Sequence, residues 1–411
     1  MRASLALPRA GAIVLFTALC GLLAGAQAVQ SSDGSEQSAS VIVTDSQAAP
    51  EQLKVEDVPQ PTPMRAQDIQ TIFAFGDSYT SVHYKVKNGY EPRGPKQDIR
   101  TTSGAKNWIQ YLSEHLHVED SLYDFAVSGS SIEPLVLHAG EAPNPCLINQ
   151  TDLFEQYFVD KDNVAWDPRT TLFVVASGIN DIANSIMLDI NYEAKINNLV
   201  DIYRAQLQRL VTGGARHFLL MPVPPFDRTP LAMNGAHHSK FVEWVHMWNF
   251  RFFDVVSTFQ TDNPKLNVQV WDWHSVLDEI LDNAKSAYGF KETSTSCWPY
   301  ARINHYAPAA KDDECRVPMS EYVWKDSAHP TWRVHELLSE SVIKLLSEDL
   351  SEQVVQTKRE LGNSNSSTAF ERHRRRGLNK MHFAKKSTSS SRVQLNRRSE
   401  PLVVEAGFDR L

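Results

Sequence analysis

Short apolar runs alternate with amphipathic stretches through the middle of the chain. The apolar runs are hydrophobic at nearly every position, which is typical of strands covered on both faces. They are 71–77, 171–178, 217–225 and 267–273. The amphipathic stretches, which place apolar residues at helical spacing, are 105–116, 192–214, 239–260 and 331–350. This alternation predicts a doubly wound parallel sheet, and such sheets bind ligands at the carboxyl ends of their strands.

Composition divides the 411 residues into four segments. Two arginines, an apolar core at 12–23 and small residues up to Ala28 are typical of a secretory signal peptide, so residues 1–28 are expected to be removed. Residues 29–68, rich in Ser, Gln, Ala and Pro, are expected to form a disordered linker, and 69–351 a single domain. Residues 352–411 are polar and basic, and a disordered tail is expected.

Charge is unevenly spread along the chain. The net charge is −8, but residues 357–411 contain 13 Lys and Arg against 5 Asp and Glu, a net +8 that leaves −16 for the remainder. Such a tail is attracted to acidic surfaces, although a nucleic-acid partner is not expected for a secreted chain. No later apolar run reaches 18 residues, so no transmembrane segment is expected.

Cysteine usage fits an oxidising compartment. Cys297 and Cys315 are candidates for one local disulfide, and Cys146 is interpreted as a buried free thiol. Asn149 and Asn365 begin possible glycosylation sequons.

The first apolar run ends in "FAFGDSYT", which places Gly76, Asp77 and Ser78 at the end of a strand. One interpretation is ordinary turn chemistry, in which Asp77 or Ser78 caps the following helix. The other is a nucleophile, Ser78, delivered to the ligand-binding edge of the sheet. A nucleophilic serine needs a base.

Among the 14 histidines, His329 alone has an aspartate three residues before it, Asp326 in "KDSAHPTW". A short turn lets such a carboxylate reach the imidazole and fix its tautomer. The spacing is common by chance. Its placement is more informative, because Pro330 and an amphipathic helix follow directly.

Two further segments offer donors for a developing oxyanion. Asn180 in "GINDI" follows a buried strand, and Gly129 in "YDFAVSGSSI" offers a backbone N–H that no side chain blocks. Taken singly, Asn180 reads as a turn residue and Gly129 as a loop hinge. Their order along the chain with Ser78 and His329 favours a catalytic site.

The ordered set of these segments resembles the four blocks of the GDSL (SGNH) hydrolases and, more narrowly, the fungal secreted acetylesterases of carbohydrate esterase family 16. The resemblance spans about 73–338 and implies a flavodoxin-like three-layer α/β/α fold with serine ester hydrolysis that needs no metal or other cofactor. It implies that Ser78 is the nucleophile, His329 the base and then the acid, and Asp326 the residue that orients His329. The implied oxyanion hole consists of the N–H groups of Ser78 and Gly129 with the Asn180 amide.

The resemblance also implies that Asp77 and Asp181 do not contact the substrate but hold the catalytic loops in place, Asp181 by fixing the loop after its strand. The chain departs from the family pattern at Asp124, where Asn is frequent, and at Ser128, where a second glycine is frequent. A long segment follows the nucleophile, and its His83, Tyr84 and Tyr90 either shape a substrate pocket or lie on a surface loop.

Other hydrolase classes fit less well. Thr80 stands where a G-x-S-x-G elbow needs its second glycine, and no H-E-x-x-H zinc motif occurs. The sequence therefore predicts a secreted, monomeric esterase that removes acetyl groups from small esters or acetylated oligosaccharides. The alternatives are a GDSL lipase or phospholipase and a non-catalytic carbohydrate-binding protein. Tryptophans that could serve the binding protein are interpreted mostly as core: Trp108, Trp244, Trp248, Trp271, Trp273, Trp298 and Trp324.

Overall fold

The computed structural model describes residues 64–82, 101–134, 145–160, 166–186, 188, 190–302 and 311–347. Several predictions lie outside these residues. They concern the signal peptide, most of the linker, the basic tail, Asn365, and the three aromatic residues His83, Tyr84 and Tyr90.

The centre of the described chain is a parallel sheet of five strands in the order β2-β1-β3-β4-β5. The strands are β1 (Thr71–Gly76), β2 (Leu122–Asp124), β3 (Thr171–Ala176), β4 (His217–Met221) and β5 (Asn267–Val270). This order is that of flavodoxin-like sheets, and it reverses direction between β1 and β3. The predicted doubly wound fold is confirmed, and the carboxyl ends of β1 and β3 lie where the strand order reverses, the place where such sheets bind ligands.

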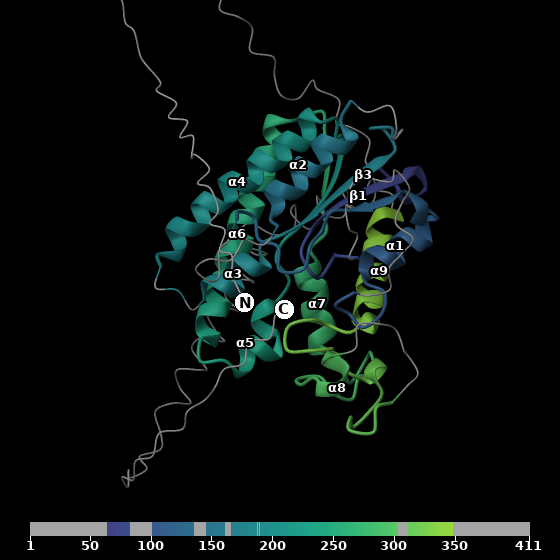
Figure 1. Ribbon diagram of the computed structural model, residues 1–411, viewed down its shortest axis with the longest axis vertical. Helices are drawn as coiled ribbons and strands as arrows, with labels where there is room; N and C mark the ends of the chain where they lie inside the picture. Colours follow the sequence, from purple (N-terminus) through teal and green to yellow (C-terminus); the bar gives the residue numbers. More distant parts are fainter. Residues whose placement is uncertain are drawn as a thin grey trace, which may run out of the picture. The chain divides into compact units, whose positions relative to one another are not determined.

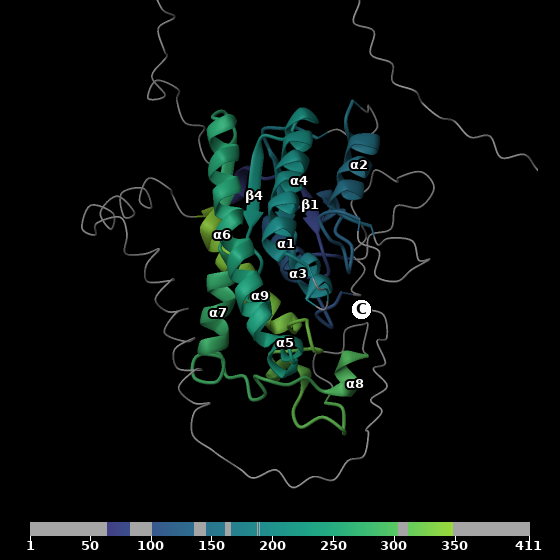
Figure 2. The same ribbon diagram turned by 90° about the vertical axis from the view of Figure 1, so that its left-hand side faces the viewer.

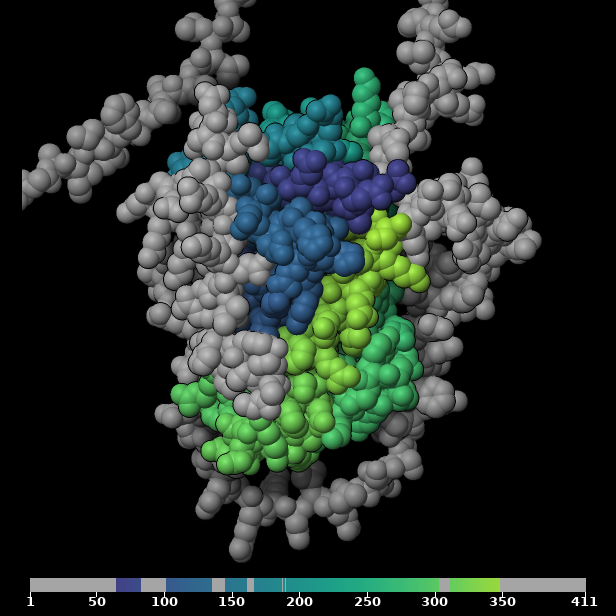
Figure 3. Space-filling view, turned by 90° about the vertical axis from the view of Figure 1, so that its right-hand side faces the viewer, coloured from purple at the N-terminus to yellow at the C-terminus, as the bar shows by residue number. Residues whose placement is uncertain are grey.

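Helices cover both faces of the sheet (Figure 1). They are α1 (Trp108–Leu116), α2 (Leu147–Phe158), α3 (Ile179–Ser185), α4 (Tyr192–Thr212), α5 (Pro230–Asn234), α6 (His238–Asp262), α7 (Trp273–Asp282), α8 (Trp298–Ala301) and α9 (Trp332–Ser347). Helices α2, α4 and α6 form one layer, which faces the viewer in Figure 2. Helices α1, α7 and α9 form the other, and Figure 3 shows α1 and α9 side by side despite their distance in sequence.

Aromatic side chains fill the space between the sheet and the α2 layer. Phe73 of β1 is fully buried and lies 5.2 Å from the ring of Phe173 on β3 and 5.1 Å from that of Phe154 on α2. Large buried rings contribute strongly to core stability, so this packing holds β1 in place. The tryptophans interpreted as core are buried, except that Trp298 on α8 is 66% exposed.

Several element boundaries differ from the prediction. The run 267–273 was expected to be one strand, but β5 ends at Val270 and α7 begins at Trp273, because Asp272 caps the helix by accepting from Ser275 N–H. The runs 171–178 and 217–225 likewise extend beyond β3 and β4, which end at Ala176 and Met221. The hydrophobic pattern did not predict β2, α2, α3, α5, α7 or α8. Within the described ranges, no helix combines the length and apolar character needed to cross a membrane.

Candidate active site

Ser78, His329 and Asp326 form a continuous row of hydrogen bonds at the carboxyl end of β1. His329 Nε2 lies 2.8 Å from Ser78 Oγ, and His329 Nδ1 lies 2.9 and 3.0 Å from the two carboxylate oxygens of Asp326. A carboxylate accepts only, so Nδ1 carries the proton and Nε2 is left to accept from the serine hydroxyl. We call these three residues the candidate triad. The structure therefore brings together residues that are 251 positions apart.

The turn after β1 fixes the position of Ser78. A side chain on Gly76 would place its Cβ 2.3 Å from the carbonyl oxygen of Ala176 on β3, so only glycine fits here. Asp77 Oδ1 accepts from Tyr79 N–H at 3.0 Å, and the Asp77 carbonyl accepts from Ser81 N–H at 2.9 Å. Gly-Asp-Ser thus forms a turn, which is compatible with the nucleophile interpretation, but the described residues up to 82 contain no helix for Asp77 or Ser78 to cap.

A tight loop before α9 presents His329. Asp326 Oδ1 accepts from the backbone N–H groups of Ala328 and His329, each at 2.8 Å. The buried Tyr79 hydroxyl donates to the Ala328 carbonyl at 2.6 Å, which ties this loop to the nucleophile turn. Burial alone would raise the pKa of Asp326, but the charge and hydrogen bond of His329 outweigh it, and the pKa is lowered to about 2. Asp326 is therefore ionised at any pH where the protein works.

The predicted oxyanion donors lie on the neighbouring loops. Gly129 has φ +79°, a left-handed conformation that glycine adopts without strain. Among the described residues, the backbone N–H groups of Ser78 and Gly129 have no acceptor. Asn180 Nδ2 donates one hydrogen to the Ser130 carbonyl at 2.8 Å, which fixes the amide and leaves its second hydrogen for a ligand.

Three buried aspartates, Asp77, Asp124 and Asp181, accept hydrogen bonds from backbone N–H groups of these loops. Both oxygens of Asp181 accept from Ile132 N–H, at 3.2 and 3.1 Å, so Asp181 connects the loop after β3 with the loop that carries Gly129. Asp124 accepts from Val82 N–H at 2.9 Å and from Ala126 N–H at 2.8 Å. Burial raises the pKa of Asp77 and of Asp181 to about 7, and raises that of Asp124 well above its usual range.

Sequence reasoning missed several residues that hold the nucleophile turn. Gln150 of α2 forms hydrogen bonds of 2.8 Å with both the N–H and the carbonyl of Gly76. Thr102 donates to the Ser78 carbonyl at 2.6 Å, and Asn107 donates to the Thr80 carbonyl at 2.6 Å. Asn107 also begins α1 as its N-cap, so one side chain serves both helix and turn. No signal in the sequence indicated Gln150, because the hydrophobic pattern did not predict α2.

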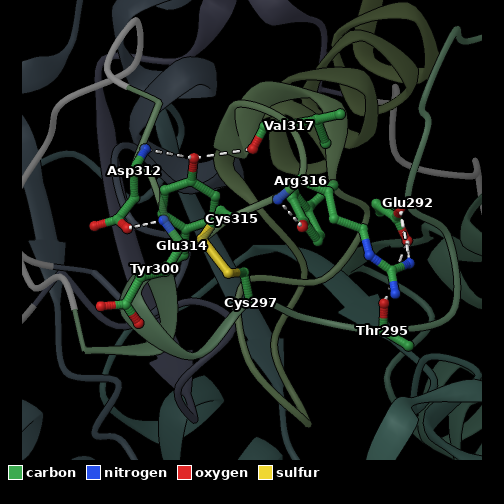
Figure 4. Close-up of a disulfide and its surroundings, with 10 residues drawn as sticks. Glu292, Thr295, Cys297, Tyr300, Asp312, Glu314, Cys315, Arg316 and Val317 are labelled. Atoms are coloured by element: carbon green, nitrogen blue, oxygen red, sulfur yellow. Dashed lines mark hydrogen bonds and ion pairs between the residues drawn. A yellow bond between two sulfur atoms is a disulfide. The ribbon is translucent and has the colours of Figure 1, made fainter.

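The cysteines and the first sequon have defined environments. Cys297 and Cys315 form a disulfide at α8 (Figure 4). Cys146 is free and buried, and burial raises the pKa of its thiol, so it is not activated as a nucleophile. Asn149 is exposed near the start of α2, and its Oδ1 accepts from Cys146 N–H at 3.1 Å. Within the described part of the chain, no cluster of three or more His, Cys, Asp or Glu could hold a metal ion.

Comparisons with known proteins identify the family of the chain and several similar proteins. The family model for GDSL-like lipases and acylhydrolases matches residues 72–342. The chain is similar to an acetylesterase of Thermothelomyces thermophilus, with 28% identity over 283 residues that cover 64% of this chain and 92% of that protein. It is also similar to the thermolabile hemolysin of Vibrio parahaemolyticus, with 23% identity over 289 residues that cover 68% of this chain and 65% of that protein. A solved catalytic mutant of an acetylxylan esterase from Geobacillus stearothermophilus matches with a TM-score of 0.39 and 11% identity, covering 68% of this chain and 94% of that one.

Proposed function

The chain belongs to the GDSL-like lipase and acylhydrolase family, as its motifs predicted, and is a carboxylic ester hydrolase; we propose that it is a secreted serine esterase that removes acetyl groups from acetylated oligosaccharides of plant polysaccharides. The observation that carries this proposal is the candidate triad, in which Ser78 Oγ, His329 and Asp326 are joined by hydrogen bonds of 2.8 to 3.0 Å. A nucleophile, a base and a group that orients the base are the parts that acyl transfer requires.

In the first half of the proposed reaction, Ser78 Oγ attacks the ester carbonyl carbon while His329 Nε2 takes the hydroxyl proton. The carbonyl oxygen becomes an oxyanion, which accepts hydrogen bonds from the N–H groups of Ser78 and Gly129 and from the Asn180 amide. The C–O bond to the alcohol then breaks, and His329 returns the proton to the departing oxygen. The acetyl group remains on Ser78.

Water completes the second half of the reaction. His329 Nε2 takes a proton from a water molecule whose oxygen attacks the acyl-enzyme carbonyl, and the same donors hold the second oxyanion. Collapse breaks the bond to Ser78 Oγ, which recovers its proton from His329, and acetate leaves. Asp326 stays ionised throughout, which the lowered pKa of its carboxyl supports.

Two further parts of the proposal rest on different features. The similarity to an acetylesterase supports acetyl as the acyl group. The composition of residues 1–28 supports secretion, and sequencing the N-terminus of protein recovered from culture medium tests it. A mature chain that still begins at Met1 would contradict this part.

A lipid ester is the second candidate substrate. Met233 on α5 is 55% exposed, and Leu188, which follows α3, is 45% exposed. Helix α3 follows β3 and helix α5 follows β4, and the carboxyl ends of these two strands lie at the same edge of the sheet as Ser78. Apolar side chains in such positions would contact acyl chains or a lipid surface. A lipase or phospholipase would therefore prefer long acyl chains.

The test is hydrolysis of p-nitrophenyl acetate, butyrate and octanoate, followed by acetate release from acetylated xylo- and cello-oligosaccharides and from triacetin. We expect the acetate ester to be preferred and Ser78→Ala to lose at least about 10³-fold in kcat. The matched control is Ser286→Ala, since Ser286 is exposed beyond α7. Activity of Ser78→Ala near that of the control would refute the role of Ser78, and a preference for octanoate would favour the lipase.

A further inference from the structure

A buried lysine lies directly behind the carboxylate of the candidate triad. Lys325 is 4% exposed, and its Nζ lies 3.0 Å from the carbonyl oxygen of Ala301 and 3.7 Å from Asp326 Oδ2. A buried ammonium is unfavourable unless it is paired. Burial lowers the pKa of Lys325, whereas the neighbouring Asp326 raises it. An ammonium kept at this depth therefore depends on these two oxygens.

The two oxygens of Asp326 have different surroundings. Oδ1 accepts from the N–H groups of Ala328 and His329, and it also lies 2.9 Å from His329 Nδ1. Oδ2 lies 3.0 Å from His329 Nδ1 and has the Lys325 ammonium on another side. The backbone thus holds one oxygen, and the lysine holds the other. Removing the ammonium would leave Oδ2 with the imidazole as its only partner among the described residues.

The carbonyl that anchors Lys325 is itself fixed. Ala301 ends α8, which begins directly after Cys297, and Cys297 is bonded to Cys315. The Tyr300 hydroxyl donates to the Val317 carbonyl at 3.0 Å and accepts from Asp312 N–H at 3.1 Å, as Figure 4 shows. A rigid acceptor holds the ammonium at a defined distance from Asp326.

We propose that Lys325 is a positioning residue of the reaction, a role that rests on the proposed function of the candidate triad. Its ammonium, anchored on the Ala301 carbonyl, holds the Asp326 carboxylate in the orientation that binds His329. The same positive charge opposes protonation of the imidazole in the free enzyme. The base is therefore available at lower pH than it would be without the lysine.

Other titratable groups also face His329. They are Asp77 and Tyr79 on the turn after β1, Asp326 on its own loop, and His335 on α9, whose ring lies behind Tyr79. A substitution of Lys325 leaves all of these groups in place. A change in the pH profile of such a variant would then report the lysine charge itself.

The experiment compares pH profiles of kcat/KM on p-nitrophenyl acetate for the wild type, Lys325→Met, Lys325→Gln and Lys325→Arg. We expect Lys325→Met and Lys325→Gln to lose about tenfold in kcat and to move the acidic limb up by about half to one pH unit. Lys325→Arg keeps the charge and should keep the wild-type limb. The matched control, Lys291→Met, removes an exposed lysine that pairs with Glu321 and should change neither quantity.

A second measurement separates positioning from folding. If Lys325→Met does not fold, Lys325→Gln replaces it, since its amide can still donate to the Ala301 carbonyl. Combined with Asp326→Asn, either variant should cause little further loss, because the lysine acts through the carboxylate. A folded neutral variant with the wild-type acidic limb would overturn the proposal. Ser78→Ala with full activity would instead overturn the proposed function, so the two failures are distinguishable.

Discussion

The hydrogen bonds of Gln150 connect the nucleophile strand to the loop that carries Gly129. Gln150 is 1% exposed; its Oε1 accepts from Gly76 N–H, and its Nε2 donates to the Gly76 carbonyl and to Ser130 Oγ, each at 2.8 Å. Gly76 lies two residues before Ser78, and Ser130 directly follows Gly129. Gln150→Met, which keeps the length and removes the polar atoms, is expected to impair both stability and catalysis.

The magnitude follows from what remains after the substitution. The Gly76 carbonyl still accepts from Val127 N–H at 3.1 Å, and Ser130 Oγ still lies 3.3 Å from the Ser131 carbonyl. The Gly76 N–H, however, loses its acceptor, and a buried unpaired N–H costs about 1–3 kcal/mol. Two further lost bonds add about 0.5–1.5 kcal/mol each. We expect a total of about 2–6 kcal/mol. We also expect kcat to fall about tenfold, because the turn that positions Ser78 loses its hydrogen bonds to Gln150.

Urea denaturation and steady-state hydrolysis of p-nitrophenyl acetate measure the two effects. The matched control is Gln206→Met, since Gln206 is also buried on a helix, but its Nε2 has one long contact of 3.5 Å, with the Ile202 carbonyl. Its Oε1 accepts from Arg209 Nη1 at 3.0 Å, and Arg209 keeps its bonds to Asp152 and Glu155 when this acceptor is removed. The control should lose less than about 1 kcal/mol and keep its kcat. If Gln150→Met denatures at the same urea concentration as the control, the assigned role of the amide is wrong.

Three further substitutions test other parts of the site. The two oxygens of Asp124 accept from the N–H groups of Val82 and Ala126, and Asp124→Asn leaves only one acceptor oxygen for them. We expect the free energy of unfolding, measured by urea denaturation, to fall by about 1–3 kcal/mol. Burial lowers the pKa of His335 from 6.5 to about 3. As the pH drops, the unfolded chain therefore binds a proton at this histidine before the folded chain does. The free energy of unfolding is expected to fall by up to about 5 kcal/mol between pH 6.5 and pH 3. His335→Gln should flatten the dependence of Tm on pH in that window, and an unchanged dependence would exclude His335 as its cause. Trp298 is an exposed ring on α8 that could contact a sugar. Trp298→Ala should raise the KM for acetylated oligosaccharides several-fold and leave the KM for p-nitrophenyl acetate unchanged. Equal changes of KM for both substrates would contradict a sugar contact.

The sequence predicted the strands and the candidate triad because each depends on a strong local pattern. Continuous apolar runs marked β1, β3 and β4, and parallel strands place whatever follows them at one edge, which is why Ser78 and Asn180 were expected to be neighbours. β2 was missed because three residues are too few to show a period. Most of the seven tryptophans were interpreted as core, and Trp298 is the exposed one: it lies at the start of α8, a helix of four residues that buries Tyr300 instead.

Long-range polar partners were harder to predict. Nothing in the residues around Gln150 indicates that its amide meets Gly76, 74 positions earlier, because a hydrogen bond between distant elements leaves no periodic signal. The same holds for the Tyr79 hydroxyl and the Ala328 carbonyl, 249 positions apart. Asp124 was noted as a departure from the family pattern, and its two backbone N–H partners give the physical reason for a carboxyl group there.

The pKa values of four aspartates at the candidate site are shifted in opposite directions, and this difference suits the proposed chemistry. Burial raises the pKa of Asp77 and Asp181 to about 7 and that of Asp124 well above its usual range, whereas that of Asp326 is lowered to about 2. At mildly acidic pH, Asp326 alone among them is fully ionised, and it lies on the far side of His329 from Ser78. An imidazolium is therefore stabilised, while no carboxylate beside Ser78 or Asn180 repels a developing oxyanion. In the proposed mechanism, ionisation of Asp77 and Asp181 above about pH 7 would place negative charge near the oxyanion, so we expect kcat on p-nitrophenyl acetate to fall as the pH rises past that value.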